Sequence, residues 1–416
     1  MRARPSGTVM EIPGAGRLPG LAAESFHTGR HLANARRQAE AGIDDVLVID
    51  ADAHVYEKES IADIIALIED PIVRQLARSA QGAARQAARF PLDRVAYHDL
   101  GGRITRDILR RLETTPGDGT HRAADLALRA MDAMGIDVAA LSPFGLQIMG
   151  LHPQPEVEAG VLGAYNRWLT ERVLPVSPRL LGWIMLPFGA PRAALDMVDA
   201  YAGRPGIAGF QVTALREKSV HDNAYMPVYA AIQETGLPLA FHGGTDWEDP
   251  LFRAVGKFMA VKALSQQWYN IVHCTNWVVN GMPERFPRMP VIWMDSGISW
   301  VPWLMMRIDN EYRMRSSECP SLTRLPSAYM REMYYTSNPV EMPDREDALA
   351  AAYRAIDAPN SLIYASNYPA SDMDLPGAVA GLAILGEAEK RRILGETARR
   401  LFRLPETVAA GYMRDG

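Results

Sequence analysis

The chain has 416 residues, of which 48% are hydrophobic and 22% charged, and its formal net charge is −5 at pH 7. This composition is typical of a globular protein with a large apolar core. Because no dense basic cluster occurs, we expect no nucleic-acid partner, and the apolar runs are too short to span a membrane. The two cysteines, Cys274 and Cys319, lack CxxC spacing, which argues against disulfides and thiolate zinc sites and favours a reducing cytoplasm.

Residues 1–44 are rich in Gly, Pro, Ala and Arg. We interpret them as an arm that packs on the surface or on a partner subunit, with a disordered tail as the alternative. The segment 45–405 is predicted to form one barrel domain. A helical insertion with a loop is expected at about 60–121, because this stretch is too long for an ordinary connection. Residues 406–416 are predicted to be a C-terminal tail.

Short apolar, β-branched runs alternate with helical patterns along this domain. Strands are expected at 46–51, 138–141, 180–186, 207–212, 237–241, 291–294, 333–336 and 362–365. Helices are expected at 125–134, 192–201 and 226–235, and Gly135 and Gly236 are expected to end the first and last of these. Strands that alternate with helices favour a parallel α/β sheet, and eight such units fit a closed (β/α)8 TIM barrel. An open doubly wound sheet is the competing fold, but no glycine fingerprint follows the first strand.

In a barrel of this type, the residues just past the carboxyl ends of the strands face the active site. Asp52 and His54 follow the first strand, and their two-residue spacing places both side chains on the same side. A carboxylate and an imidazole can ligate one divalent metal ion. Glu57 lies a turn further along the chain and is another candidate ligand. The alternative is a charged loop beside a hydrogen-bonded histidine.

Polar residues also follow the fifth, sixth and eighth strands. His242 ends the fifth strand and precedes Gly243 and Gly244, which predicts a side chain in the cavity and a close approach of the backbone. Histidines at two strand ends are better explained by a metal site than by two separate structural roles. Asp295 follows the sixth strand and Asn367 the eighth, where ordinary turn chemistry is the alternative.

Three further features carry weaker predictions. His273 is expected on the first turns of a helix after the fifth strand, as a ligand of a second metal or as a base; a structural role is the alternative. The Trp- and Met-rich stretch 293–306 is expected to supply core and subunit contacts rather than a cofactor site. Arginine or lysine residues near the mouth of the barrel are expected to hold a carboxylate of the substrate.

Six short motifs occur in order between about residues 46 and 405: IDADAHVYE, RLLGWIMLP, LPLAFHGG, GMPERFPRMPVIWMDSG, WVPWLMMRID and YASNYP. Their order and spacing resemble the amidohydrolase-related metal enzymes (amidohydrolase 2), in particular the aminocarboxymuconate-semialdehyde, resorcylate and carboxyvanillate decarboxylases. The resemblance implies a (β/α)8 barrel that holds a divalent metal ion, usually zinc or manganese, and acts on a small-molecule substrate.

The resemblance also implies a set of metal ligands. The family's first-strand pair falls on Asp52 and His54, and its fifth-strand histidine falls on His242. Its sixth-strand histidine falls at or beside Asp295 and its last-strand aspartate falls on Asn367, so these two positions depart from the family pattern. Asn367 can ligate a metal ion through its carbonyl oxygen, but it cannot accept a proton near neutral pH.

Three functions are compatible with these residues. The leading hypothesis is a metal-dependent hydrolase or non-oxidative decarboxylase of a small carboxylate-bearing substrate, with His273, Asp295 and Asn367 as candidate catalytic residues. The second is an oxygen-activating dinuclear iron or manganese enzyme of the aminoisobutyrate hydroxylase type, in which Glu57 and His273 are also ligands. The third is a degenerate subunit that supports an active paralogue. We also expect a homo- or hetero-oligomer.

Overall fold

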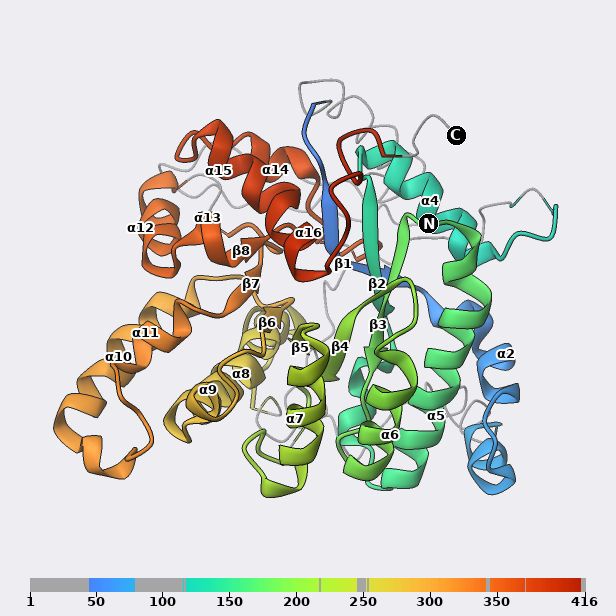
Figure 1. The fold of residues 1–416 in the computed structure, drawn as a ribbon, viewed down its shortest axis with the longest axis horizontal. Helices are drawn as coiled ribbons and strands as arrows, with labels where there is room; N and C mark the ends of the chain where they lie inside the picture. Colours follow the sequence, from blue (N-terminus) through green and yellow to red (C-terminus); the bar gives the residue numbers. More distant parts are fainter. Residues whose placement is uncertain are drawn as a thin grey trace, which may run out of the picture.

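The computed structural model describes residues 45–78, 115, 117–216, 218–244, 252, 254–341, 345–370 and 372–412. Eight parallel strands follow one another in sequence order around a barrel (Figure 1). They are β1 (Ile49–Val55), β2 (Val138–Pro143), β3 (Leu180–Met185), β4 (Ile207–Thr213), β5 (Leu239–His242), β6 (Val291–Met294), β7 (Tyr334–Thr336) and β8 (Leu362–Ile363). The segment after β8 is joined to β1 because Ala51 N donates to the carbonyl of Tyr364 and Asn367 N to that of Asp52, both at 2.9 Å. The predicted (β/α)8 fold is confirmed.

The helices lie outside the strands (Figure 1). They are α2 (Ile61–Ala66), α4 (Arg122–Met134), α5 (Pro155–Trp168), α6 (Pro191–Tyr201), α7 (Met226–Thr235), α8 (Phe258–Val279), α9 (Met282–Arg285), α10 (Trp300–Arg315), α11 (Pro326–Met330), α12 (Glu346–Ile356), α13 (Ala358–Ser361), α14 (Pro376–Ala380), α15 (Glu387–Arg391) and α16 (Thr397–Leu401). The two predicted glycine caps are confirmed, because Gly135 after α4 has a φ of 73° and Gly236 after α7 a φ of 66°.

Strand β1 begins and ends later than its apolar run predicts. The run predicted a strand at 46–51, whereas β1 spans Ile49–Val55 and includes the polar residues Asp52 and His54. Its pairing with β2 shifts register in the middle of the strand. This irregularity explains how Ala51 can pack in the barrel interior while Asp52 and His54 also face inward, since strict alternation would put Asp52 on the other face.

Apolar side chains fill the barrel interior away from the carboxyl ends of the strands. Trp183 on β3 is fully buried, packs edge-on against Phe402 with ring centroids 5.5 Å apart, and donates its indole N–H to the carbonyl of Ala51 at 2.9 Å. Ile292 of β6 belongs to the same cluster, and a larger core lies between the strands and the helices. The inward-facing polar side chains are therefore concentrated at the carboxyl ends of the strands.

The segments outside the regular barrel are described only in part. Within the predicted insertion, α2 and residues 71–78 are helical. The predicted arm, 1–44, lies outside the described residues, as do most of 79–116 and the end of the tail, 413–416. In the part of the chain that the structure describes, no helix combines the length and the hydropathy needed to cross a bilayer.

The Trp- and Met-rich stretch divides between the core and the surface. Trp293 on β6 and Trp300 on α10 are buried, as expected for core residues. Trp303 and Met306 on α10 are 51% and 68% exposed. The subunit contacts that we predict for this stretch stay a prediction.

Candidate metal centre

Three side chains from two strands converge at the carboxyl end of the barrel. Asp52 and His54 come from β1 and His242 from the end of β5, and all three are almost completely buried. Asp52 Oδ1 lies 3.2 Å from His242 Nε2 and 3.7 Å from His54 Nε2. One ligand atom from each residue can be chosen so that all lie within 4.8 Å of one another. The structure thus brings together the three residues that the sequence placed at the ends of the first and fifth strands.

The hydrogen bonds of His242 leave its second nitrogen facing the carboxylate. Nδ1 lies 2.5 Å from the carbonyl oxygen of Gly243, which can only accept a hydrogen bond, so Nδ1 carries a proton. In neutral His242 the lone pair of Nε2 then points at Asp52 Oδ1, and two acceptors at 3.2 Å require a proton or a cation between them. Burial lowers the pKa of His242, but the Asp52 carboxylate outweighs it and raises the pKa to about 9. This charge pattern is typical of a cation site.

Asp52 provides a second observation that fits a metal ion. Its other oxygen, Oδ2, is buried and has no hydrogen-bond partner among the described residues. An unpaired carboxylate oxygen in the interior is costly unless a positive group compensates it. Burial raises the pKa of Asp52, but the neighbouring His242 and His54 lower it by more than burial raises it. The pKa of Asp52 therefore lies below its ordinary value, and the carboxylate stays ionised. One carboxylate and two imidazoles are donors that suit zinc, manganese or iron.

Ser142 on β2 contacts both His54 and Asp52. The Ser142 hydroxyl lies 2.8 Å from His54 Nδ1 and 3.4 Å from Asp52 Oδ1. When the hydroxyl accepts from Nδ1 and donates to Asp52, Nδ1 carries the proton of neutral His54, and the lone pair on Nε2 can act as a ligand. Sequence reasoning missed Ser142, although it occupies the end of the second strand as Asp52 and His242 do on theirs.

Asn367 and Asp295 extend the cluster across the barrel. Asn367 Oδ1 lies 2.9 Å from His54 Nε2, and its Nδ2 donates to Asp295 Oδ1 at 3.0 Å. Asn367 and Asp295 have φ values of 54° and 51°, a left-handed conformation that Asn and Asp tolerate better than most residues. The two departures from the family pattern are therefore in contact with each other.

Asp295 is a buried carboxyl held by amide donors on both oxygens. Asn367 binds Oδ1, and Gln266 on α8 donates Nε2 to Oδ2 at 2.8 Å. Burial raises the pKa of Asp295 to about 7, against a lowering effect of Lys262. Sequence reasoning missed Gln266, which lies on a helix and not at a strand end. The available signal was the spacing of Gln266, Asn270 and His273, which places three polar residues on one face of a helix.

Glu57 does not lie with the candidate ligands. Its carboxylate accepts hydrogen bonds from Phe144 N at 2.9 Å and Gly145 N at 2.7 Å, and its side chain is buried. The chain enters a short 3₁₀ helix at Glu57–Ser60, so the side chain turns toward the segment after β2. Glu57 holds this segment in place, and Phe144 packs edge-on against the His54 ring with centroids 5.7 Å apart.

His273 is also separate from the three-residue cluster. It lies in the second half of α8, not on the first turns of a helix as the sequence predicted, because α8 already begins at Phe258. Its Nε2 donates to the carbonyl of Ala214 at 2.9 Å. Burial lowers its pKa to about 4, so the side chain is neutral near pH 7. This geometry supports the structural alternative for His273.

The two glycines after His242 differ in the space around them. A Cβ atom on Gly243 would lie 2.7 Å from the backbone oxygens of Asp295 and Gln266, whereas one on Gly244 would meet the Leu215 side chain at 2.5 Å. The Leu215 side chain can rotate away from an added Cβ atom, but the backbone oxygens near Gly243 cannot. They belong to Asp295 and Gln266, two residues of the site. We expect Gly243→Ala to cost about 1–3 kcal/mol of stability, as overpacking does, and to weaken manganese binding. Gly244→Ala should do much less to either.

This comparison is checked by urea unfolding and by titration calorimetry with manganese on both variants. Equal metal affinities for the two variants would show that the backbone contact at Gly243 does not hold His242 in place.

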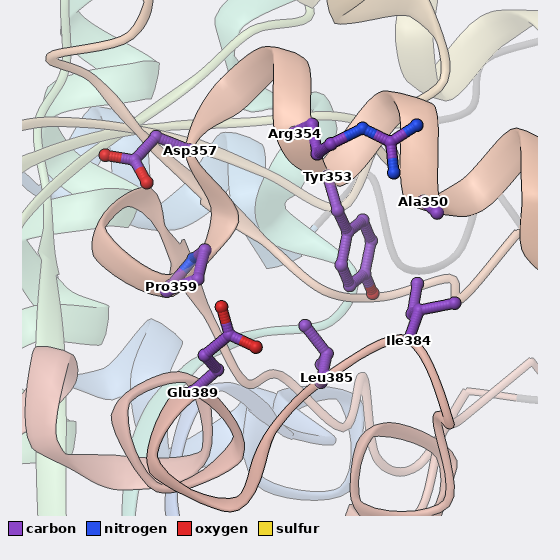
Figure 2. A pocket seen from close by; sticks show the side chains of 8 residues that line it. All are labelled: Ala350, Tyr353, Arg354, Asp357, Pro359, Ile384, Leu385 and Glu389. Carbon is purple, nitrogen blue, oxygen red and sulfur yellow. The ribbon is translucent and has the colours of Figure 1, made fainter.

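The chain also has a surface pocket of about 240 Å³, whose lining side chains are shown in Figure 2. It is lined by residues of α12, α13 and the region of α15: Ala350, Tyr353, Arg354, Asp357, Pro359, Ile384, Leu385 and Glu389. None of the cluster residues contributes to it, so the candidate metal centre and this pocket are separate features.

Comparisons with known proteins agree with the barrel fold. The sequence profile of the amidohydrolase family matches residues 49–404. The crystal structure of 5-carboxyvanillate decarboxylase from Sphingomonas paucimobilis superposes with a TM-score of 0.61 at 19% identity, over 86% of this chain and 100% of that chain. The 2,6-dihydroxybenzoate decarboxylase from Rhizobium gives a TM-score of 0.59 at 17% identity, over 86% of this chain and 99% of that chain.

A third structure contains a metal ion. The 5-carboxyvanillate decarboxylase from Novosphingobium aromaticivorans, complexed with manganese and 4-hydroxy-3-methoxy-5-nitrobenzoic acid, gives a TM-score of 0.62 at 18% identity, over 87% of this chain and 98% of that chain. At such identities the three structures show a shared fold. No curated protein matches the sequence significantly. The family profile extends from the first strand to beyond the last, and the chain belongs to the amidohydrolase family.

Proposed function

We propose that this protein is a metal-dependent decarboxylase that removes a carboxylate from a small aromatic acid without oxidation. The observation that carries the proposal is the buried cluster of Asp52, His54 and His242 next to the carboxyl group of Asp295. Two of the similar structures are named as decarboxylases of hydroxylated benzoic acids. The chemistry requires that the bond between the ring carbon and the carboxylate breaks, that its electron pair stays on the ring, and that a proton replaces the lost CO2.

The first three residues would hold the ion. Asp52 offers a carboxylate oxygen, and His54 and His242 each offer Nε2, while Asn367 Oδ1 is the candidate for a fourth donor because it already faces His54 Nε2 at 2.9 Å. A bound divalent ion supplies positive charge that holds and polarises substrate oxygens beside the reacting carbon. Zinc, manganese and iron all suit these donors, and manganese is the ion named in the similar structure.

Asp295 is our candidate for the residue that holds the proton. Its two oxygens are fixed by amide donors from Asn367 and Gln266, so the carboxyl group is oriented before the substrate binds. Asn367 cannot carry a proton. In this chain the acid–base group is thus proposed to lie after the sixth strand, and the amide at the last strand positions it.

Phe144 provides an apolar wall beside the candidate ligands. It is 37% exposed although its ring packs against His54, and Glu57 fixes its backbone. An aromatic substrate ring could stack or pack edge-on here, as aromatic pairs do. This supports an aromatic acid over an aliphatic one.

The oxygen-activating alternative has less support. It requires ligands for a second ion, and Glu57 and His273 instead bind backbone groups. Among the residues that the structure describes, the Asp52 cluster is the single group of three potential ligands. The degenerate-subunit alternative is weakened because the cluster keeps both its candidate ligands and a neighbouring carboxyl group.

The proposal is tested with the purified, manganese-loaded protein and a panel of hydroxylated benzoic acids that includes 5-carboxyvanillate and 2,6-dihydroxybenzoate. We expect CO2 release from at least one acid, and in D2O the product should carry deuterium at the vacated ring carbon. Oxygen consumption with a hydroxylated product would contradict the proposal.

Metal removal provides a further prediction. An ion that binds the folded chain and not the unfolded chain stabilises the fold by RT ln(1 + c/Kd), where c is the concentration of the free ion. We therefore expect a chelator to lower the Tm and abolish turnover, and manganese to restore both. Turnover that survives complete metal removal, verified by elemental analysis, would contradict a metal-dependent reaction.

A further inference from the structure

A lysine lies at the rim of the candidate metal centre. Lys262 is on the second turn of α8, and its Nζ lies 3.2 Å from Asp372 Oδ2. The two side chains are 34% and 30% exposed, so solvent and small solutes can reach the pair. The other oxygen of Asp372 lies 3.4 Å from Asn367 Nδ2. Two polar contacts therefore connect the Lys262 ammonium to the residue that faces His54.

Two residues on the same face of α8 lie near the site, and one is buried while the other is partly exposed. Gln266, one helical turn after Lys262, is buried and donates to Asp295. Lys262 lies on the partly exposed side of this contact, and its charge acts on Asp295. A ligand that enters next to Asp295 and Asn367 from the solvent side therefore approaches the Lys262 ammonium.

The charge at this rim matters because the site itself is rich in carboxylates. Asp372 lies at this rim and Asp52 belongs to the buried cluster behind it, and both carboxylates repel an anionic substrate. Arg216, at the end of β4, does not offset this, because it is 3% exposed and pairs with buried Glu158 at 3.2 Å. A lysine in a partly exposed ion pair can exchange its partner at little cost.

We propose that Lys262 binds a second anionic group of the substrate, which takes the place of Asp372 on the ammonium. The ligand class is an aromatic acid with two anionic substituents, one near the candidate metal ligands and one at Lys262. Asp372 is then a competing partner that holds the ammonium at the rim between binding events. This inference rests on the proposed function, since it assigns the orientation of the aromatic acid in that site.

Binding of two non-hydroxylated probes tests the inference without turnover. Isophthalate carries a second carboxylate that benzoate lacks, and both are titrated calorimetrically into the manganese-loaded protein. We expect wild-type protein to bind isophthalate at least about tenfold more tightly than benzoate, as a charge-assisted contact provides. Lys262→Gln should reduce this preference to near one, and Lys262→Arg should keep part of it. Asp372→Asn should strengthen isophthalate binding.

The matched control is Lys218→Gln. Lys218 also pairs with an aspartate, Asp222, at 3.3 Å and is 50% exposed, but we assign it no role in the site. It should leave the preference unchanged. An unchanged preference in Lys262→Gln, no preference in the wild type, or weaker binding in Asp372→Asn would each overturn the inference.

These outcomes separate the inference from the reaction on which it rests. If Lys262 provides the preference for isophthalate but no aromatic acid releases CO2, the anion site stands and the decarboxylase assignment fails. If an aromatic acid is decarboxylated and Lys262→Gln keeps the wild-type preference, the anion site alone fails.

Discussion

His242→Ala is expected to bind manganese at least roughly 100-fold more weakly than the wild type, since even changes around a metal ligand cost 10–100-fold. The physical reason is that the variant removes one of three candidate donors and leaves Asp52 buried without its main partner. Turnover should be lost together with the metal. Titration calorimetry with manganese, after removal of endogenous metal, measures the effect.

His273→Ala is the matched control for this prediction. It also removes a buried histidine, but one whose nitrogen binds the carbonyl of Ala214 instead of a cluster residue. We expect it to lower stability and to leave metal affinity within a few-fold of the wild type. If a folded His273→Ala protein, verified by circular dichroism, loses metal as His242→Ala does, the ligand set proposed here is wrong.

Asp295→Asn is expected to lower kcat by about 10²–10⁴-fold, which is the usual contribution of a positioned acid or base. Asparagine keeps the size of the side chain and can still accept from Asn367, but it cannot hold a proton. Because Asp295 is not one of the three candidate ligands, manganese affinity should change little. Steady-state kinetics and metal titration on the same preparation separate the two effects.

Asp374→Asn is the control for Asp295→Asn. Asp374 is another largely buried carboxyl, which accepts from Asn338 and from Val340 N, and it has no contact with the candidate ligands in the described structure. It should retain the wild-type kcat. Equal losses in both variants would indicate a general effect of removing buried charge, and a large loss of metal in Asp295→Asn would assign Asp295 to the ligands instead.

The fold could be predicted because the barrel strands are short apolar runs between helical patterns. Strand β6 spans the predicted residues and α7 begins and ends as expected. Among the strands, β1 differs most from its predicted bounds, and it continues through Asp52 and His54 because the barrel interior can hold polar side chains at its carboxyl end. The hydrophobic run ends at Ala51, before Asp52, so the apolar pattern cannot predict such an extension.

The site could be predicted only where it follows strand ends. Asp52, His54 and His242 are candidate ligands because each lies at the carboxyl end of a predicted strand. The contact between Asp295 and Asn367, which are 72 residues apart, depends on how strands and loops close across the barrel, and no local pattern contains it.

The structure places the side chains of two other candidate ligands, Glu57 and His273, away from the three-residue cluster for the same reason. Glu57 is close to His54 in sequence, but a 3₁₀ turn directs its side chain to the backbone after β2. His273 follows the fifth strand, but α8 begins earlier than expected, at Phe258, so His273 lies in the second half of the helix. Once the chain leaves a strand, the spacing of residues in the sequence no longer determines where their side chains point.

The central claim is that one divalent ion is held by Asp52, His54 and His242. The most direct test is the metal-to-chain ratio, measured by elemental analysis of wild-type protein that has been loaded with excess manganese and then dialysed. The account predicts one ion per chain. No retained metal, or two ions per chain, would contradict it.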